Sequence, residues 1–149
     1  INLQGDEPLI RPSDIRNFIN FALKNKTIVT NAFTNINNIK KSSNINLPKL
    51  VISKDNFLLY MSRSPIPRSK NKDTKIKFFK QVCMYGFPKK ILKKIYGANK
   101  KKTRLESIED IEILRVIENG YIVKMLKVND NKIAIDTPSD LIAAKKLIK

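Results

Sequence analysis

The chain has 149 residues, of which 42% are hydrophobic, and a single cysteine. That length fits one domain with a packed core. No apolar run approaches the roughly 20 residues needed to cross a bilayer, and one cysteine excludes an internal disulfide, so we expect a cytoplasmic protein that makes no membrane contact.

The formal net charge is +17, from 30 Lys and Arg against 13 Asp and Glu. A charge of this size is typical of proteins that bind polyanions. Aromatic residues make up only 7% of the chain, however, and do not alternate with basic ones as in nucleic-acid-binding surfaces. Lysine far outnumbers arginine, and asparagine and isoleucine are abundant, which is the pattern that AT-rich codons produce. We therefore expect no nucleic-acid partner. A basic nucleic-acid-binding module remains an alternative, which a steep salt dependence of oligonucleotide binding would favour.

Hydrophobic spacing predicts alternating strands and helices in the first two thirds of the chain. A strand opens the chain before Gly5, and a helix with Ser13 as its N-cap should follow, because apolar residues recur every three or four positions up to Leu23. The later predicted elements are a strand at 27–33, a loop at 34–46, a hairpin of 49–53 and 57–61, a strand at 78–87, and a short helix from Pro88 that ends at Gly97.

Two capping boxes mark helices in the last third. Ser107 and Asp110 predict the start of one helix, with Gly120 after its end, and Thr137 and Asp140 predict the start of a final helix. Strands are expected between them at 121–128 and 132–135. The alternation predicts an α/β fold, with a mixed sheet flanked by helices in a single domain over residues 1–149.

Two aspartates follow apolar strand segments. Asp6 comes after Gly5 at the end of the first strand, and Asp136 comes after the apolar segment 133–135. Mg²⁺ takes oxygen ligands, often one or two carboxylates with phosphate oxygens and water, so the pair suggests a metal-assisted reaction. The alternative is that Asp6 caps a turn and Asp136 stabilises a helix N-terminus. The residues alone support both interpretations equally.

Five segments, in order, resemble the 3-deoxy-manno-octulosonate (Kdo) cytidylyltransferase family, also called the CMP-Kdo synthetases. Each segment alone is a weak signal, but together they span nearly the whole chain. They are Leu-Gln-Gly-Asp-Glu-Pro at 3–8, Tyr-Met-Ser-Arg-Ser-Pro-Ile-Pro at 60–67, Tyr-Gly-Phe at 85–87, Leu-Glu-Ser-Ile-Glu at 105–109 continuing to Glu-Ile-Leu-Arg at 112–115, and Ile-Asp-Thr-Pro-Ser-Asp-Leu at 135–141.

The resemblance implies a fold and a reaction. The fold would be nucleotide-diphospho-sugar-transferase-like, that is, Rossmann-like. The reaction would couple CTP to Kdo or another 2-keto-3-deoxy sugar acid, giving a CMP-sugar and pyrophosphate for lipopolysaccharide biosynthesis. Asp6 and Asp136 match the family's Mg²⁺ ligands and would be its catalytic residues. The family's enzymes are homodimers, and the interface is expected between residues 49 and 87.

The resemblance also assigns five residues to the sugar. Arg63 suits the sugar carboxylate, because a guanidinium binds a carboxylate bidentately, and the others suit hydroxyl groups. Two departures put the identity of the sugar in doubt: Gln81 stands where the family usually has histidine, and Ile113 stands where it usually has a polar residue. The residues assigned to the sugar are Gln4, Arg63, Gln81, Tyr85 and Glu112.

The family's glycine-, arginine- and lysine-containing loop, which holds the triphosphate, has no counterpart in this sequence. The chain also starts with Ile1 inside an expected strand. We therefore expect the C-terminal portion of a cytidylyltransferase domain, inactive by itself. A catalytically inert truncated relic is a further alternative, and it would show no cooperative transition in a circular dichroism melt.

Overall fold

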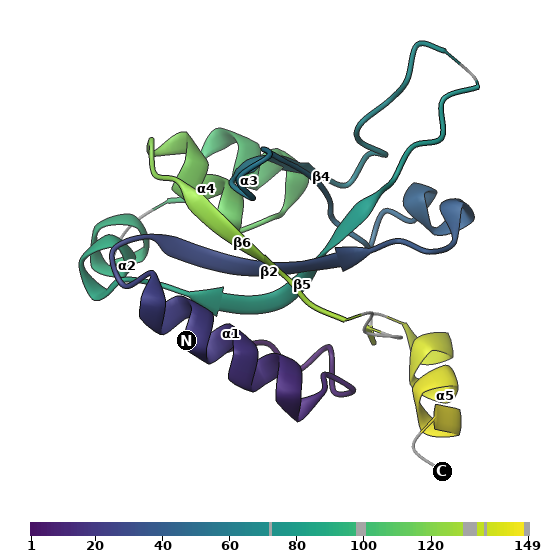
Figure 1. Ribbon diagram of the computed structural model, residues 1–149, viewed down its shortest axis with the longest axis horizontal. Coiled ribbons are helices and arrows are strands. Elements are labelled where there is room, and N and C mark those ends of the chain that lie inside the picture. Colours follow the sequence, from purple (N-terminus) through teal and green to yellow (C-terminus); the bar gives the residue numbers. More distant parts are fainter. Residues whose placement is uncertain (72, 98–100, 130–133, 136, 148–149) are drawn as a thin grey trace.

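The structure is a computed structural model that describes residues 1–71, 73–97, 101–129, 134–135 and 137–147. Its centre is a six-stranded sheet with the order β4-β3-β5-β2-β6, and β1 pairs with β5 beside β3 (Figure 1). The β2–β6 pair is parallel and the other pairs are antiparallel, so the predicted mixed sheet is confirmed. The strands are β1 (Asn2–Leu3), β2 (Val29–Asn35), β3 (Lys49–Ile52), β4 (Leu58–Ser62), β5 (Phe79–Gly86) and β6 (Val123–Lys127).

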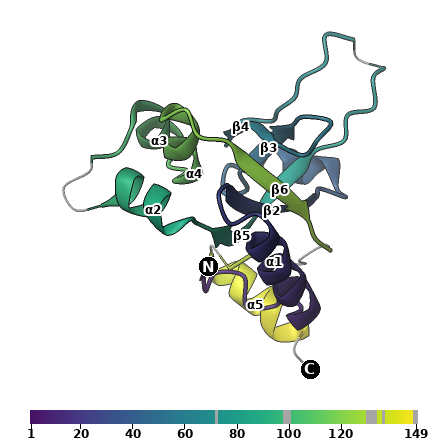
Figure 2. The same ribbon diagram turned by 60° about the vertical axis from the view of Figure 1, so that its left-hand side comes forward.

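Helices cover both faces of the sheet. Successive side chains on a strand point to opposite faces, so apolar residues on each face pack against a different set of helices. On one face, Val82 and Met84 of β5 pack with Phe18 of α1 (Pro12–Lys24). On the other face, a larger apolar cluster joins the sheet to α2 (Lys89–Tyr96), α3 (Arg104–Glu109) and α4 (Ile113–Glu118). Figure 2 shows α1 on the side of the sheet opposite α3 and α4.

Helix α1 begins two residues earlier than predicted. Its first residue is Pro12 and its N-cap is Arg11, which makes no side-chain capping bond. Proline's fixed φ suits a first helical position, so the helix starts at the proline and the predicted cap at Ser13 is wrong. The predicted apolar face is buried only in part, since Phe18 is fully buried whereas Ile19 and Leu23 are exposed.

The single helix predicted from Ser107 is two helices. The capping box of α3 is formed by Thr103 and Glu106, with the Thr103 N–H donating to Glu106 Oε2 at 3.1 Å. Asp110 then adopts a left-handed conformation, with φ 50°, which ends α3 before α4 begins. The predicted box from Ser107 to Asp110 is therefore wrong, and Glu112 is the N-cap of α4.

The segment 34–46, predicted as a loop, contains the end of β2 and a short 3₁₀ helix, η1 (Ile39–Ser43), whereas the other elements follow the prediction closely. The hairpin of β3 and β4, the long strand β5 and the short helix α2 before Gly97 are all present, although α2 starts at Lys89, with Pro88 as its N-cap. Helix α5 (Pro138–Leu147) opens with the predicted Thr137–Asp140 box, in which the Thr137 N–H donates to Asp140 Oδ2 at 2.9 Å. The strand predicted at 132–135 lies partly outside the described residues. No described helix is long and apolar enough to cross a membrane.

Candidate active site

A pocket of about 390 Å³ opens where β1, β5 and the α3–α4 junction meet. Six of the seven site residues predicted from the sequence line it, and the seventh, Asp136, lies outside the described residues. The residues that line the pocket are Gln4, Asp6, Asn46, Pro48, Arg63, Gln81, Cys83, Tyr85, Asp110, Ile111 and Glu112.

Asp6 is held at the end of β1 by main-chain bonds. The Gln4 N–H donates to the Cys83 carbonyl of β5 at 3.2 Å, and the Ile135 N–H donates to the Asp6 carbonyl at 2.8 Å. Two segments from opposite ends of the sequence therefore meet at Asp6. The sequence places Ile135 directly before Asp136, the other predicted carboxylate.

Glu7 fixes the same loop from the other side. Its Oε2 accepts the Cys83 N–H at 2.8 Å, and its Oε1 lies 3.8 Å from Lys80 Nζ. Both side chains are buried, with 3% and 9% of their surface exposed. Sequence reasoning missed both residues, because their pairing appears only when β1 is laid against β5.

The carboxylate of Asp6 has one oxygen ready for a ligand. Oδ2 accepts a weak bond from the Cys83 thiol at 3.6 Å, whereas Oδ1 is buried and has no hydrogen-bond partner among the described residues. A buried, unbonded carboxylate oxygen is costly unless a cation or donor meets it, so Asp6 fits a hard cation such as Mg²⁺. The described residues contain no group of three or more His, Cys, Asp or Glu side chains that could hold a metal ion.

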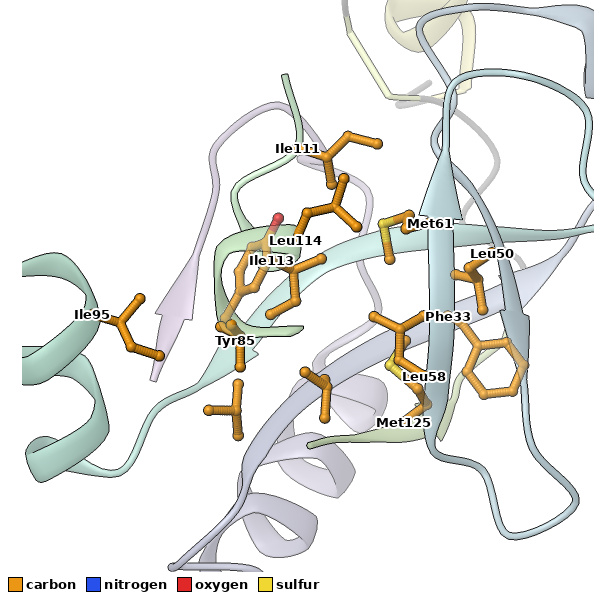
Figure 3. Packing of buried hydrophobic residues seen from close by; sticks show 13 residues of the cluster. Phe33, Leu50, Leu58, Met61, Tyr85, Ile95, Ile111, Ile113, Leu114 and Met125 are labelled. Atoms are coloured by element: carbon orange, nitrogen blue, oxygen red, sulfur yellow. The ribbon is translucent and has the colours of Figure 1, made fainter. Parts of the chain in front are cut away.

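The floor of the pocket consists of Gln81, Cys83 and Tyr85, which point to one face of β5. Burial raises the pKa of Tyr85 well above its ordinary value, so its hydroxyl stays protonated and can donate a hydrogen bond. Burial also raises the pKa of the Cys83 thiol, with the carboxylates of Glu7 and Asp6 adding to the effect. Cys83 is therefore a neutral part of the floor rather than a nucleophile. Figure 3 shows the Tyr85 ring beside Ile113 and Leu114.

The wall of the pocket consists of Arg63, Asp110 and Glu112, at the end of β4 and the α3–α4 junction. The Arg63 guanidinium donates to three main-chain carbonyls: those of Glu109 at 2.5 Å, Asp110 at 2.8 Å and Ile45 at 3.0 Å. The side chain that the sequence assigns to the sugar carboxylate therefore lines the pocket while it braces the loops around it.

Glu109 anchors this wall to β4. Its carboxylate accepts the Ser62 hydroxyl at 2.6 Å and the Arg63 N–H at 2.8 Å. Beside it, the fully buried ammonium of Lys49 donates to the carbonyls of Asn44, at 2.8 Å, and Arg63. Burial, and then the nearby Arg63 charge, lower the pKa of Lys49 to about 8. Sequence reasoning missed the role of Lys49, because in the sequence it is simply the first residue of a predicted strand.

Glu112 borders a second hollow as well. This smaller cavity, of about 200 Å³, shares Gln4, Tyr85 and Glu112 with the main pocket and is closed by aromatic and aliphatic side chains. The Tyr96 hydroxyl donates to the Glu112 carbonyl at 2.6 Å, which ties α2 to the start of α4. The acidic side chain of Glu112 is thus presented at the junction of the two hollows.

Comparison with known proteins gives the same family that the five segments indicate. The family model described as cytidylyltransferase matches residues 1–135. The chain belongs to the cytidylyltransferase family. It is 36% identical to a 3-deoxy-manno-octulosonate cytidylyltransferase of Chloroherpeton thalassium, covering 99% of this chain and 61% of that protein. It is 37% identical to the protein of that name from Thermodesulfovibrio yellowstonii, covering 99% of this chain and 59% of the relative.

A solved structure shares the fold. It is a CMP:2-keto-3-deoxy-manno-octonic acid synthetase complexed with CTP, with a TM-score of 0.86 and 28% identity over 99% of this chain. The chain spans 60% of that structure and about the same share of the curated relatives. The fold predicted from the sequence is thus confirmed as that of a family member, over the length that the two chains share.

Proposed function

We propose that this chain carries the sugar-acid and metal-binding part of an enzyme that couples CTP to a 2-keto-3-deoxy sugar acid. The products would be a CMP-sugar and pyrophosphate, and the CMP-sugar would supply lipopolysaccharide biosynthesis. The observation that carries the proposal is the convergence of Gln4, Asp6, Arg63, Gln81, Tyr85 and Glu112, chosen from separate sequence segments, on one pocket.

The reaction is a nucleotidyl transfer. The anomeric hydroxyl oxygen of the sugar attacks the α-phosphorus of CTP, the bond from that phosphorus to the bridging oxygen of the β-phosphate breaks, and the hydroxyl proton is released with pyrophosphate. Little covalent chemistry falls to the protein, so positioning and charge stabilisation supply most of the catalysis. The chain contains no histidine, so a histidine base within it is excluded.

Each pocket side chain has a task in that scheme. Gln4, Gln81, Tyr85 and Glu112 would hold the sugar hydroxyls, with the protonated Tyr85 as a donor. Arg63 would exchange a carbonyl partner for the sugar carboxylate, because a bidentate, charge-assisted pair is stronger than bonds to neutral carbonyls.

Asp6 and Asp136 would hold Mg²⁺. The support for this pair is the unbonded Oδ1 of Asp6 and the 2.8 Å bond from Ile135, the residue before Asp136, to the Asp6 carbonyl. When bound, Mg²⁺ draws negative charge from the α-phosphate and the leaving pyrophosphate. We further propose a cytoplasmic homodimer, with its interface between residues 49 and 87.

The test uses the protein expressed from its complete reading frame, supplied with CTP, Mg²⁺ and Kdo, with pyrophosphate release as the readout. Asp6→Asn and Asp136→Asn should each slow turnover by about 100-fold or more, because each removes a ligand from a site with few protein groups. Asp55→Asn, at an exposed turn, is the matched control and should change nothing. Near-normal pyrophosphate release by Asp136→Asn would overturn its metal role, and no CMP-sugar from the wild-type protein would overturn the proposed function.

A further inference from the structure

Asn31 of β2 is a fully buried polar residue beneath the pocket floor. It lies at the point where the pairing of β2 with β5 shifts register, between Asn31 and Ala32. Its Nδ2 donates to the Met84 carbonyl at 2.8 Å and lies 3.3 Å from the Val82 carbonyl. The amide group therefore fills the gap that the irregular pairing leaves between the two strands.

Those carbonyls fix which way the Asn31 amide faces. A carbonyl oxygen only accepts hydrogen bonds, so the NH₂ end of Asn31 must face Met84 and Val82, and a flipped amide would press Oδ1 against two oxygens. Oδ1 consequently faces Gln81, and Gln81 Nε2 donates to it at 3.1 Å. The two main-chain carbonyls thus fix the orientation of the Asn31 amide, and Asn31 Oδ1 in turn fixes which end of the Gln81 amide faces it.

Gln81 is held by hydrogen bonds from both its main chain and its side chain. Its main-chain N–H donates to the Pro48 carbonyl at 3.0 Å, and its side-chain NH₂ is engaged by Asn31. Only 6% of the residue is exposed, and it lines the pocket. Beyond the N–H that it donates to Asn31, the side chain can offer a bound molecule the acceptor Oε1 and the second N–H of its amide.

We propose that Asn31 is a positioning residue that holds the Gln81 amide so that Oε1 is presented to the pocket as an acceptor. The floor would then select a sugar acid that places a hydroxyl or another hydrogen-bond donor against Gln81. This inference rests on the proposed function, and it adds a residue that lines no part of the pocket. A substrate lacking the donor leaves a buried oxygen unpaired, which is a strong basis for discrimination.

The experiment is a double-mutant cycle in the protein expressed from its complete reading frame, with Kdo, CTP and Mg²⁺ as probes. The variants are Asn31→Leu, which keeps approximate size but loses both hydrogen-bonding functions, Gln81→Ala, and the two combined. Asn31→Leu should raise the KM for Kdo about tenfold and leave the KM for CTP within about twofold. In the Gln81→Ala background, Asn31→Leu should have no further effect on the KM for Kdo.

The cycle separates positioning from a merely structural role. Asn31→Leu also removes the side-chain donor from the Val82 and Met84 carbonyls, so it should still destabilise the protein in the Gln81→Ala background, whereas its effect on Kdo should vanish once Gln81 is gone. An equal rise in the KM for Kdo in both backgrounds would overturn the proposal. So would an unchanged KM for Kdo in the single variant.

Two further measurements apply if Asn31→Leu does not fold. Asn31→Thr keeps a hydroxyl that can donate to a strand carbonyl and accept from Gln81, so its KM for Kdo should stay within about threefold of the wild type. In the wild-type protein, the side-chain NH₂ of Gln81, identified by its loss in Gln81→Ala, should exchange slowly with water without ligand and stay slow when Kdo binds. Fast exchange in the free protein would overturn the inferred amide orientation, whether or not the protein makes CMP-Kdo.

Discussion

The floor and the wall of the pocket are built in different ways. The floor residues Gln81, Cys83 and Tyr85 belong to one strand that is bonded to β1 on one side and β2 on the other, and their polar groups are neutral. The wall residues Arg63, Asp110 and Glu112 lie on loops that are joined by bonds from charged side chains. The floor should therefore be rigid and insensitive to pH and salt, whereas the wall should respond to both.

The largest effect should come from the pair that joins α3 to α4 behind the wall. Arg115 donates to Glu106 at 2.5 and 2.8 Å, and both side chains are nearly buried. Glu106→Gln leaves the guanidinium without its charge partner and should lower the free energy of unfolding by about 3–5 kcal/mol, measured by urea denaturation. Asp110→Asn breaks the exposed pair with Lys102 and is the control that should change stability little. Equal losses of stability in the two variants would contradict the inference that the Glu106–Arg115 ion pair holds α3 and α4 together.

The wall should also show a pH dependence that the floor lacks. The pKa of Lys49 is lowered to about 8 in the folded protein, against an ordinary value of 10.5. Between these pH values the unfolded chain holds the extra proton, so the free energy of unfolding should rise with pH, by up to about 3 kcal/mol, and be flat below pH 8. Subtracting the same curve for Lys49→Met isolates this residue, and parallel curves would show that Lys49 titrates normally.

A substitution of Glu109 tests how much of the stability of the wall depends on this one side chain. Glu109→Gln keeps the shape, but its one oxygen can accept from only the Ser62 hydroxyl or the Arg63 N–H, and its NH₂ group meets the other. We therefore expect a loss of about 2 kcal/mol in the free energy of unfolding and a several-fold rise in the KM for Kdo. Gln81 and Asn31 do not contact it, so its effect should add to theirs. Strong coupling between Glu109 and Gln81 would show that floor and wall are not independent.

A smaller effect is expected at the end of the floor strand. A methyl group on Gly86 would lie 2.3 Å from the Thr30 hydroxyl and 2.9 Å from the Ala22 side chain. Gly86→Ala should cost about 1–2 kcal/mol, since the hydroxyl can rotate away but α1 cannot retreat freely. The readout is urea denaturation, with Gly5→Ala as control because nothing lies within 4 Å there. A larger loss in Gly5→Ala would contradict the packing of β5 against α1.

The sequence and the resemblance selected residues that the structure brings together, but they did not give the helix ends. Gln4, Asp6 and Tyr85 were chosen from the segments that resemble the family, and all three line one pocket. The cap at Ser107 was wrong because Thr103 offers the same pattern four residues earlier, and the ion pair of Glu106 with Arg115 favours it. Local sequence cannot rank two equivalent caps when a distant partner decides between them.

Asn31 and Lys49 could not be predicted at all. In the sequence, Asn31 is one of many asparagines, and its role depends on a register shift that no residue pattern announces. Lys49 likewise lies in a run of ordinary strand residues, and only the closure of two loops over it makes it buried. The roles of both residues depend on hydrogen bonds to main-chain carbonyls. Every residue has such a carbonyl, so the sequence does not show which ones will be partners.

The 2.8 Å bond from Ile135 to Asp6 has a consequence for the order of folding. The β3–β4 hairpin and the α3–α4 pair join residues close in sequence and can form early, whereas this contact closes a loop of nearly the whole chain and must wait for the sheet. The pocket around Asp6 is therefore expected to be the last part to assemble and the first to come apart. Mild denaturant should abolish the proposed metal binding at Asp6 before it unfolds the sheet, so that its loss reports a local opening rather than global unfolding.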